Sequence, residues 1–294
     1  MPDITAVFGF DMETDAGSWS PYYRGVVEGT PQLIDLLAAQ EATATFFFTG
    51  DAARNFPEVV RAVDDAGHEV GCHSLYHETV GDPIFDIPGV KPLLPQEVPL
   101  RLQVATDWVA ESLGRQPISF RAPRLWASTA VLNALEDMGY VADASYPLYF
   151  YEERLAPYHP SREDWTQPGE MRILEIPNFA DMGVDSTDEY GRDRDQWPLF
   201  RTQSAEKLMV HIDSFIAYVR ERGEPVVLCF YFHPWEFVEM PTQMHYGEGT
   251  VIPDYFLVEN CGPYALEQLG ALMELLGARG ATFTTAEGLA ANWD

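Results

Sequence analysis

The sequence has few cysteines and no long apolar run, and each shortage excludes a class of protein. Its three cysteines, Cys72, Cys229 and Cys261, lie far apart and lack Cys-x-x-Cys spacing. This spacing argues against a disulfide framework and against a zinc site built from thiolates. No apolar run approaches the ~18 to 20 residues that a membrane-spanning helix needs. The sequence therefore predicts reduced thiols and no membrane partner.

Basic residues are also scarce, with 18 Lys and Arg against 46 Asp and Glu, for a formal net charge of −28. Such a field repels phosphate backbones, so nucleic acid is not an expected partner. The same acidic surface could serve only to keep the protein hydrated, so charge alone names no substrate. The first residues, Met1 to Thr5, lack a basic segment followed by an apolar one, which predicts a cytoplasmic protein. These features are compatible with either a monomer or a homo-oligomer.

The rest of the composition is that of a folded protein, with 46% hydrophobic and 13% aromatic residues. A chain of 294 residues can bury one large core, and α/β barrels of this size commonly form one domain. We therefore expect a single domain over residues 1–294.

Apolar, β-rich runs alternate with amphipathic helical windows, which predicts β-α units and a parallel sheet or barrel. Seven such runs occur: 4–10, 43–49, 68–72, 118–120, 140–143, 173–176 and 226–232. Helix caps are predicted at Thr30, Ser128 and Ser204. Left-handed helix ends are predicted at the glycines that follow helical windows, Gly67, Gly139 and Gly223.

Four long irregular segments interrupt the alternation and hold much of the Pro, Tyr, Trp and Asp content: 79–95, 146–169, 180–202 and 236–263. In barrel folds the loops after the carboxyl ends of the strands build the site, so these segments predict walls of a substrate groove. The aromatic cluster from Tyr146 to Tyr151 fits hydrophobic packing equally well.

The segment from Cys72 to His77 places two imidazoles four residues apart, directly after an apolar run. On one turn of helix, His73 and His77 would face the same side and could bind one divalent ion, although two surface histidines would show the same spacing. Two further apolar runs also end in ligand-type side chains, at Asp11-Met12-Glu13 and at His233-Pro234.

Five short motifs, taken in order, resemble the polysaccharide deacetylase superfamily, carbohydrate esterase family 4 with its NodB-homology domain. They are Phe10-Asp11-Met12-Glu13, His73-Ser74-Leu75-Tyr76-His77, Arg121-Ala122-Pro123-Arg124, Asp143-Ala144-Ser145-Tyr146 and Phe232-His233-Pro234. The resemblance implies an α/β fold, a distorted (β/α)7 barrel with long loops at the carboxyl face of the strands.

The resemblance also implies a metal-dependent hydrolase of amide bonds. Asp11 would be the general base, and Arg121 would hold it ionised. His233 would protonate the leaving amine, and Asp143 would raise the basicity of His233. The expected cofactor is a divalent ion, with Zn²⁺ as the default and Co²⁺, Mn²⁺ or Ni²⁺ as alternatives.

The first motif departs from the family's usual pair of adjacent Asp residues, since Met12 follows Asp11. Side chains at i and i+2 of a strand point the same way, so Glu13 is the expected carboxylate ligand beside His73 and His77, with Asp15 as the fallback. Similar Asp-x-Glu openings mark an atypical subgroup that includes enzymes resembling cyclic imide hydrolases and allantoinases.

Four further residues near the motifs are candidates for substrate binding: Trp126, Arg124, Tyr146 and Trp235. The two tryptophans could stack on a sugar ring or shield the metal. Glu236, beside Trp235, is a candidate hydrogen-bond partner.

The resemblance favours N-deacetylation of an amino sugar or oligosaccharide, a reaction of carbohydrate metabolism. The Asp-x-Glu opening favours, as an alternative, hydrolysis of a cyclic imide or an allantoin-type small molecule. A third alternative is a carbohydrate-binding barrel without catalysis, which lost its metal when Met12 replaced the second Asp.

Overall fold

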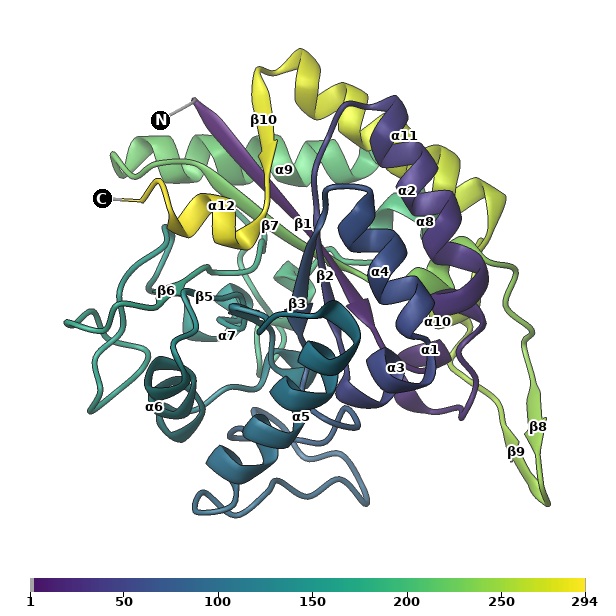
Figure 1. Cartoon of the computed structure of the whole chain (residues 1–294). Coiled ribbons are helices and arrows are strands. Elements are labelled where there is room, and N and C mark those ends of the chain that lie inside the picture. The colour runs from purple at the N-terminus through teal and green to yellow at the C-terminus, as the bar shows by residue number, and fades with distance from the viewer. Residues whose placement is uncertain (1–2, 294) are drawn as a thin grey trace.

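The computed structural model describes residues 3–293, and its centre is a curled sheet of parallel strands (Figure 1). The order is β10-β1-β2-β3-β4-β5-β6, with β7 on the other side of β1. The strands are β1 Ile4–Met12, β2 Thr45–Phe48, β3 Glu69–Cys72, β4 Ser119–Phe120, β5 Ala142–Asp143, β6 Leu174–Glu175, β7 Val227–Phe232 and β10 Ala281–Thr284. All seven predicted strands are present within a few residues of their predicted bounds.

Strand β1 is the axis of the sheet, because it pairs with three neighbours. It pairs with β7 from Thr5 to Phe10, with β10 over its first half and with β2 over its second half. An isolated parallel bridge between Asn178 and Cys229 brings the segment after β6 back to β7, so the sheet curls toward closure. Since the paired strands are all parallel, their carboxyl ends gather on one face.

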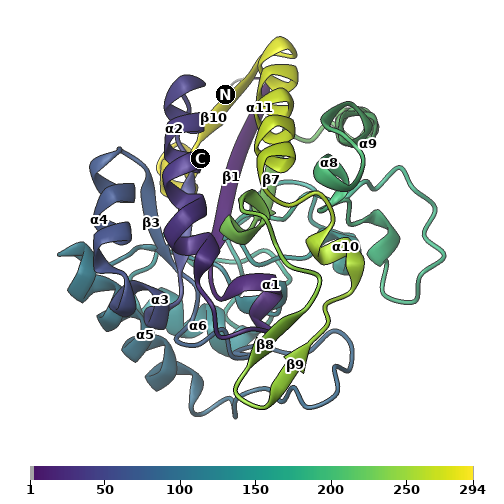
Figure 2. The ribbon, with the colours of Figure 1, turned by 90° about the vertical axis from the view of Figure 1, so that its right-hand side faces the viewer.

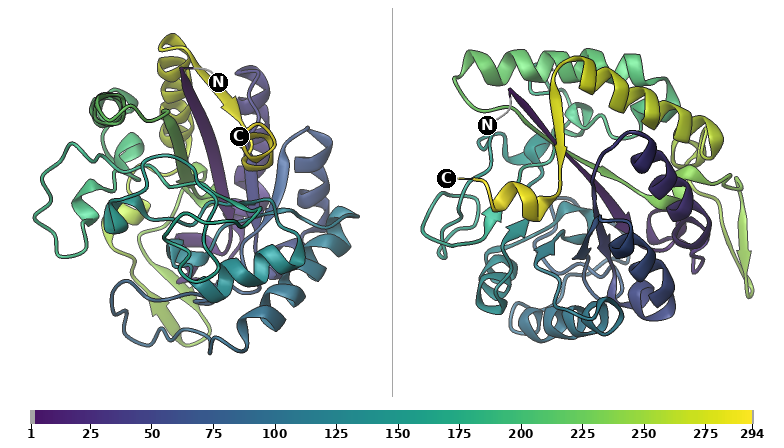
Figure 3. Two further views of the ribbon diagram at one scale, coloured as in Figure 1. Left: turned by 90° about the vertical axis from the view of Figure 1, so that its left-hand side faces the viewer. Right: turned by 45° about the horizontal axis from the view of Figure 1, so that its top comes forward.

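Helices cover the outside of this sheet, as Figures 1 and 3 show from three directions. The longer ones are α2 Thr30–Ala39, α3 Gly50–Asn55, α4 Pro57–Asp65, α5 Val98–Leu113, α6 Thr129–Met138, α9 Ala205–Glu221, α11 Pro263–Ala278 and α12 Ala286–Ala290. Short helical turns lie in the loops: α1 Asp15–Ser18, η1 Gly25–Gly29, η2 Pro123–Leu125, α7 Leu148–Tyr151, η3 Arg192–Arg194, α8 Leu199–Thr202, η4 Pro234–Phe237 and α10 Tyr255–Val258. Within the described part, no helix combines the length and the apolar character that crossing a bilayer requires.

Two of the three predicted helix caps are confirmed. The hydroxyls of Ser128 and Ser204 accept hydrogen bonds from the backbone N–H groups three residues on, at the starts of α6 and α9. The prediction for Thr30 is wrong, because the π-helical turn η1 runs directly into α2 and makes Thr30 its first helical residue. The predicted left-handed glycines are confirmed, with φ of 82° at Gly67, 84° at Gly139 and 74° at Gly223.

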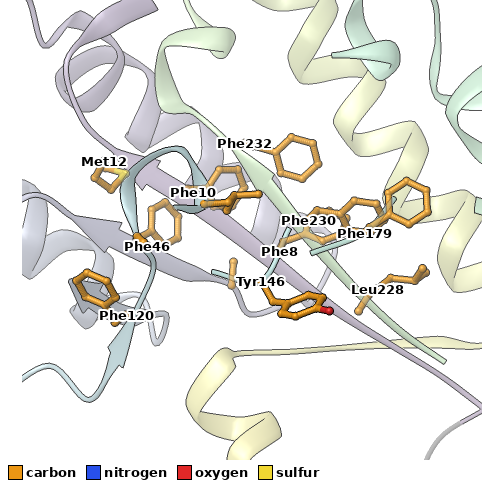
Figure 4. Packing of buried hydrophobic residues seen from close by; sticks show 14 of the residues in the cluster. Phe8, Phe10, Met12, Phe46, Phe120, Tyr146, Phe179, Leu228, Phe230 and Phe232 are labelled. Carbon is orange, nitrogen blue, oxygen red and sulfur yellow. The ribbon is translucent and has the colours of Figure 1, made fainter. Parts of the chain in front are cut away.

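Aromatic side chains from neighbouring strands fill the space between the sheet and the helices (Figure 4). Phe10 of β1 stacks on Phe46 of β2 with ring centroids 4.8 Å apart, and Phe8 meets Phe230 of β7 edge-on at 5.2 Å. These buried rings fix the register of β1 against β2 and β7. The same register determines the position, along the strand direction, of the polar residues that follow each strand.

The sequence did not predict β10 or the hairpin of β8 Met244–Tyr246 and β9 Gly249–Val251. Strand β10 is short and only partly buried, so its apolar signal is weak. The hairpin lies within the predicted loop 236–263 and projects from the body of the molecule (Figures 1 and 2). Its strands are mostly exposed, so burial leaves no pattern in their sequence.

We expect Gly25→Ala to lower the free energy of unfolding by ~1–3 kcal/mol, the usual cost of overpacking. An added Cβ there would lie 2.2 Å from the backbone nitrogen of Trp235 in η4. The matched control is Gly277→Ala in α11, where nothing lies within 4 Å of the added Cβ and stability should hold or rise. Urea unfolding measures both, and equal midpoints for the two variants would contradict the close contact between η1 and η4.

Candidate active site

A cavity of about 290 Å³ opens at the carboxyl face of the sheet. Each of the four predicted loops contributes an aromatic side chain to its wall: Phe85, Tyr149, Trp197 and Phe256. Polar residues from the ends of β1 and β7, among them Asp11, Glu13 and His233, also line it. The predicted long loops therefore do surround a pocket, and strand-end side chains reach into it.

Glu13, His73 and His77 come together at one side of this cavity, and their ligand atoms lie within 4.8 Å of one another. The Glu13 Oε2 atom is 2.5 Å from His77 Nε2 and 3.6 Å from His73 Nε2. All three side chains are buried. Among the described residues, this is the arrangement of carboxylate and imidazole groups that could hold a metal ion.

The two imidazoles do not lie on a helix, so that prediction was wrong. Residues 73–77 form a loop in which Ser74 and His77 have positive φ, 65° and 59°. The carbonyls of Ser74 and Leu75 accept hydrogen bonds from the first N–H groups of α3 rather than from a helical turn of their own. This backbone docking turns both rings inward, with their centroids 5.1 Å apart.

The buried atoms of the cluster fit a divalent cation. His73 Nδ1 lies 2.7 Å from the carbonyl of Arg121. Donation to that carbonyl leaves Nε2 as a bare lone pair, 3.6 Å from Glu13 Oε2. Within the described part of the chain, His73 Nε2 and Glu13 Oε2 are buried and have no hydrogen-bond partner. Converging lone pairs without a proton donor are what a cation satisfies.

The charges of the cluster also suit a ligand set. Burial would raise the pKa of Glu13, but the facing imidazoles of His77 and His73 hold it well below its usual value. Burial lowers the pKa of His77 despite the carboxylate beside it. An ionised carboxylate beside a neutral imidazole is the protonation state in which both groups ligate metals.

Asp15, the fallback ligand, is engaged elsewhere. Its carboxylate accepts hydrogen bonds from the backbone N–H groups of Arg24 and Gly25, at 3.0 and 2.9 Å. Burial raises its pKa to about 6. Asp15 therefore fixes the loop that leads into η1, and the geometry favours Glu13 as the carboxylate ligand.

Asp11 lies beside the cluster and is held by Arg121, as predicted. Arg121 Nη1 is 3.0 Å from Asp11 Oδ1, while Asp11 Oδ2 lies 3.9 Å from His73 Nε2. The guanidinium is fully buried and also donates to the carbonyls of Ala144 and Phe230. Gly9 leaves the room for it, because a Cβ there would lie 2.2 Å from Nη1.

His233 also lines the cavity, and its Nε2 atom lies 4.0 Å from Glu13 Oε1. Its Nδ1 is 3.1 Å from Glu236 Oε1, which also accepts from the His233 backbone N–H at 2.8 Å. Burial would lower the pKa of His233, but Glu236 and the other nearby carboxylates raise it. The ring is therefore oriented and kept basic by Glu236.

The predicted pairing of Asp143 with His233 is wrong, because Glu236 occupies that position. Asp143 is buried at the end of β5 and accepts a 2.6 Å hydrogen bond from the Ser145 hydroxyl. It lies against Glu175, and burial raises the pKa of Asp143 to about 6 and that of Glu175 well above its usual value. Asp143 and Glu175 thus form a buried pair of carboxyl groups at the ends of β5 and β6.

Two of the four predicted substrate-binding residues line the cavity, and two do not. Arg124 and Trp235 are on its wall. Trp126 is buried and meets Phe85 edge-on, so it supports the wall from behind. Tyr146 is buried among other aromatic rings, including Trp165, which confirms the packing alternative for this residue.

Arg201 and Trp197 belong to the site although the sequence did not single them out. The Arg201 Nε atom is 2.7 Å from Glu236 Oε2, and the Trp197 indole N–H donates to Glu236 Oε1 at 3.1 Å. Arg201 also donates to the carbonyls of Phe256, Leu257 and Glu259, which ties the α10 wall to the His233 network. The sequence contained one signal for this network, which was Glu236, three residues after His233. Arg201 could not be recognised because it is distant from Glu236 in the chain.

We expect Glu236→Gln to lower the pKa of His233, because the substitution removes the carboxylate that stabilises the imidazolium. In the native protein a raised folded pKa adds stability below the unfolded pKa, and that stability is lost as the pH rises through the folded value. The variant should lose that pH dependence. A ¹H NMR titration of the His233 ring measures it, with His245 of the hairpin as the reference resonance, and an unmoved midpoint would contradict the pairing.

Part of the chain is similar in sequence to known polysaccharide deacetylases. The family model for polysaccharide deacetylase matches residues 12–142. A peptidoglycan-N-acetylglucosamine deacetylase of Bacillus cereus is 27% identical over 169 residues, which cover 57% of this chain and 69% of that protein.

Solved structures share the fold across nearly the whole chain. A polysaccharide deacetylase structure from Mycobacterium smegmatis has a TM-score of 0.64 at 16% identity, over 99% of this chain and 90% of that one. An allantoinase structure has a TM-score of 0.65 at 16% identity, with the same shares of the two chains covered. The predicted (β/α)7-type barrel is thus confirmed, and residues 12–142 of the chain are similar to polysaccharide deacetylases.

Proposed function

We propose that this protein is a metal-dependent hydrolase that removes an acetyl group from an N-acetylated amino sugar within an oligosaccharide. The observation that carries the proposal is the convergence of three groups of side chains in one cavity: the Glu13 cluster, the Asp11–Arg121 pair and the His233–Glu236 pair. Amide hydrolysis needs an electrophile, a base and an acid, and each group offers one of these.

Glu13, His73 and His77 would hold a divalent ion, with zinc as the default. When bound, such an ion supplies Lewis-acid chemistry that polarises an amide carbonyl and acidifies water. Glu13 and His73 directly follow β1 and β3, and His77 lies in the loop after β3 whose backbone is hydrogen-bonded to the start of α3.

Asp11 would take a proton from the attacking water. Its Oδ1 is fixed by Arg121, so Oδ2, which faces the cluster, is the free basic atom. His233 then gives its Nε2 proton to the amide nitrogen as the carbon–nitrogen bond breaks. The products are acetate and a free amine, and Glu236 compensates the charge of His233 before that transfer.

The aromatic wall and the relatives support a sugar substrate. Trp197 and Trp235 both pack on the His233 ring with centroids 5.1 Å apart, and Trp19 and Phe256 are exposed at the mouth. Flat apolar side chains of this kind suit the faces of sugar rings. The curated relative from Bacillus cereus acts on peptidoglycan N-acetylglucosamine. The cytoplasmic location and the oligomeric state stay predictions.

Hydrolysis of a cyclic amide or imide is the second candidate, supported by the Asp-x-Glu opening and by the fold shared with an allantoinase. Release of acetate from N-acetylated oligosaccharides, set against ring opening of succinimide and allantoin, separates the two. Failure of both reactions, with no ion bound after addition of Zn²⁺, Co²⁺ or Mn²⁺, would favour the non-catalytic barrel.

We expect Asp11→Asn to lower kcat by about 10²-fold or more, the usual size of general-base assistance. The amide keeps the shape of the side chain but removes its basicity, so bound metal should be retained. Steady-state acetate release and metal analysis of the same preparation check both points. Unchanged turnover would remove Asp11 as the base.

We expect His77→Ala to lose the bound ion, because two side chains rarely hold a catalytic metal alone. The matched control is His245→Ala on the exposed hairpin, which should keep the ion. Elemental analysis of dialysed protein provides the measurement. Full metal occupancy in His77→Ala would mean that the ligands are misassigned.

A further inference from the structure

Two arginines, Arg124 and Arg192, line the cavity and have no role in the chemistry proposed above. Arg124 follows the loop after β4 and is partly buried, and Arg192 belongs to η3 in the loop 180–202. Within the described residues, neither guanidinium forms an ion pair with a carboxylate. This is unexpected in a chain with 46 acidic and 18 basic residues.

Most of the N–H donors of both guanidinium groups have no acceptor within the described residues. Arg124 uses only Nη1, in two long contacts of 3.3 Å with the His77 carbonyl and the Thr79 hydroxyl. The Arg192 guanidinium lies over the Phe85 ring, 5.1 Å from its centroid, and makes no hydrogen bond within residues 3–293. A guanidinium offers five N–H donors in a fork that matches a carboxylate.

The two arginines lie on one wall, because a ladder of aromatic contacts joins them. The Arg124 guanidinium lies 5.9 Å from the Trp126 ring centroid, Trp126 meets Phe85 edge-on at 5.0 Å, and Arg192 lies over Phe85. Arg124 is at the end nearest the metal cluster, since it contacts the backbone of His77. A substrate whose amide reaches the cluster would therefore run along this wall.

The carboxylates of the cavity form no ion pair with Arg124 or Arg192 within the described residues, although the Asp195 carboxylate acts on the Arg192 guanidinium. Asp11 is paired with Arg121, and Glu13 faces the two histidines. Asp195 accepts a 2.6 Å hydrogen bond from the Tyr231 hydroxyl, and burial raises its pKa. Asp254 is exposed at the rim. Four acidic side chains around one cavity would still repel a dianion, so the wall suits a group that carries a single negative charge.

We propose that Arg124 and Arg192 recognise a carboxylate on the substrate, so that the preferred substrate is an acidic glycan rather than a neutral chitin-type oligomer. The inference rests on the proposed function, which places the acetylated sugar at the cluster. Arg124 would bind a carboxylate on the reacting sugar, or on its neighbour, and Arg192 would act further along the wall. A charge-assisted pair of this kind is stronger than a neutral hydrogen bond.

Equilibrium binding to metal-free protein tests this preference separately from turnover. The probes are an oligosaccharide of alternating N-acetylglucosamine and uronic acid, and the same oligosaccharide with its carboxyl groups converted to amides. We expect the acidic form to bind at least about tenfold more tightly. Arg124→Gln and Arg192→Gln should each reduce this preference, whereas Arg61→Gln, an exposed arginine of α4 outside the cavity, should keep it.

The outcomes are distinct. Equal affinity for the two forms, or a preference that survives both substitutions, overturns the proposal. Tighter binding of a 6-phosphorylated N-acetylglucosamine oligomer would overturn the choice of a carboxylate. Arg124→Lys and Arg192→Lys, which keep the charge but lose the fork, should give intermediate preferences and serve if a Gln variant does not fold. Absence of deacetylation with the binding preference intact would reject the proposed function alone.

Discussion

The buried contact of Arg121 with Asp11 is the interaction on which the rest of the site depends. One residue serves two partners: its guanidinium holds Asp11, and its backbone carbonyl accepts the proton of His73 Nδ1. Arg121 therefore orients both Asp11, the proposed base, and His73, a candidate metal ligand. A charge as deeply buried as Arg121 is tolerated only because Asp11 and two carbonyls compensate it.

The strand order determines where the contact between Arg121 and Asp11 lies. Because β1 lies between β2 and β7 and all are parallel, Asp11 and Glu13 emerge between the loop after β3 and the end of β7. His233 follows the end of β7. Its imidazole contacts Glu236, which in turn pairs with the buried Arg201. The two halves of the site meet at Glu13, which lies within 4.0 Å of both His77 and His233.

Much of this arrangement could be predicted from sequence, because strands of a parallel sheet show as apolar runs and their ends carry the polar residues. The seven runs and the gathering of Glu13, His73 and His77 depend only on that logic and on the resemblance. The loop shape at 73–77 could not be predicted, because it follows from backbone contacts with α3. Its positive φ angles at Ser74 and His77 override the helical spacing.

Contacts between residues that are far apart in the sequence also could not be predicted. Asp143 and Glu236 are both acidic residues near the end of a strand, and only the fold decides which one reaches His233. Arg201 lies 35 residues before Glu236, and nothing in its neighbours marks it as buried. Strand β10 was missed because a short edge strand with half-exposed side chains carries little pattern.

The central claim is that one divalent ion is bound by Glu13, His73 and His77 beside Asp11 and His233. Anomalous diffraction from crystals grown with Co²⁺ or Zn²⁺ tests it most directly. We expect a single strong peak in contact with Glu13 Oε2 and the Nε2 atoms of both histidines. A peak bound instead by Asp15 or by surface carboxylates, or an empty cluster at saturating metal, would contradict it.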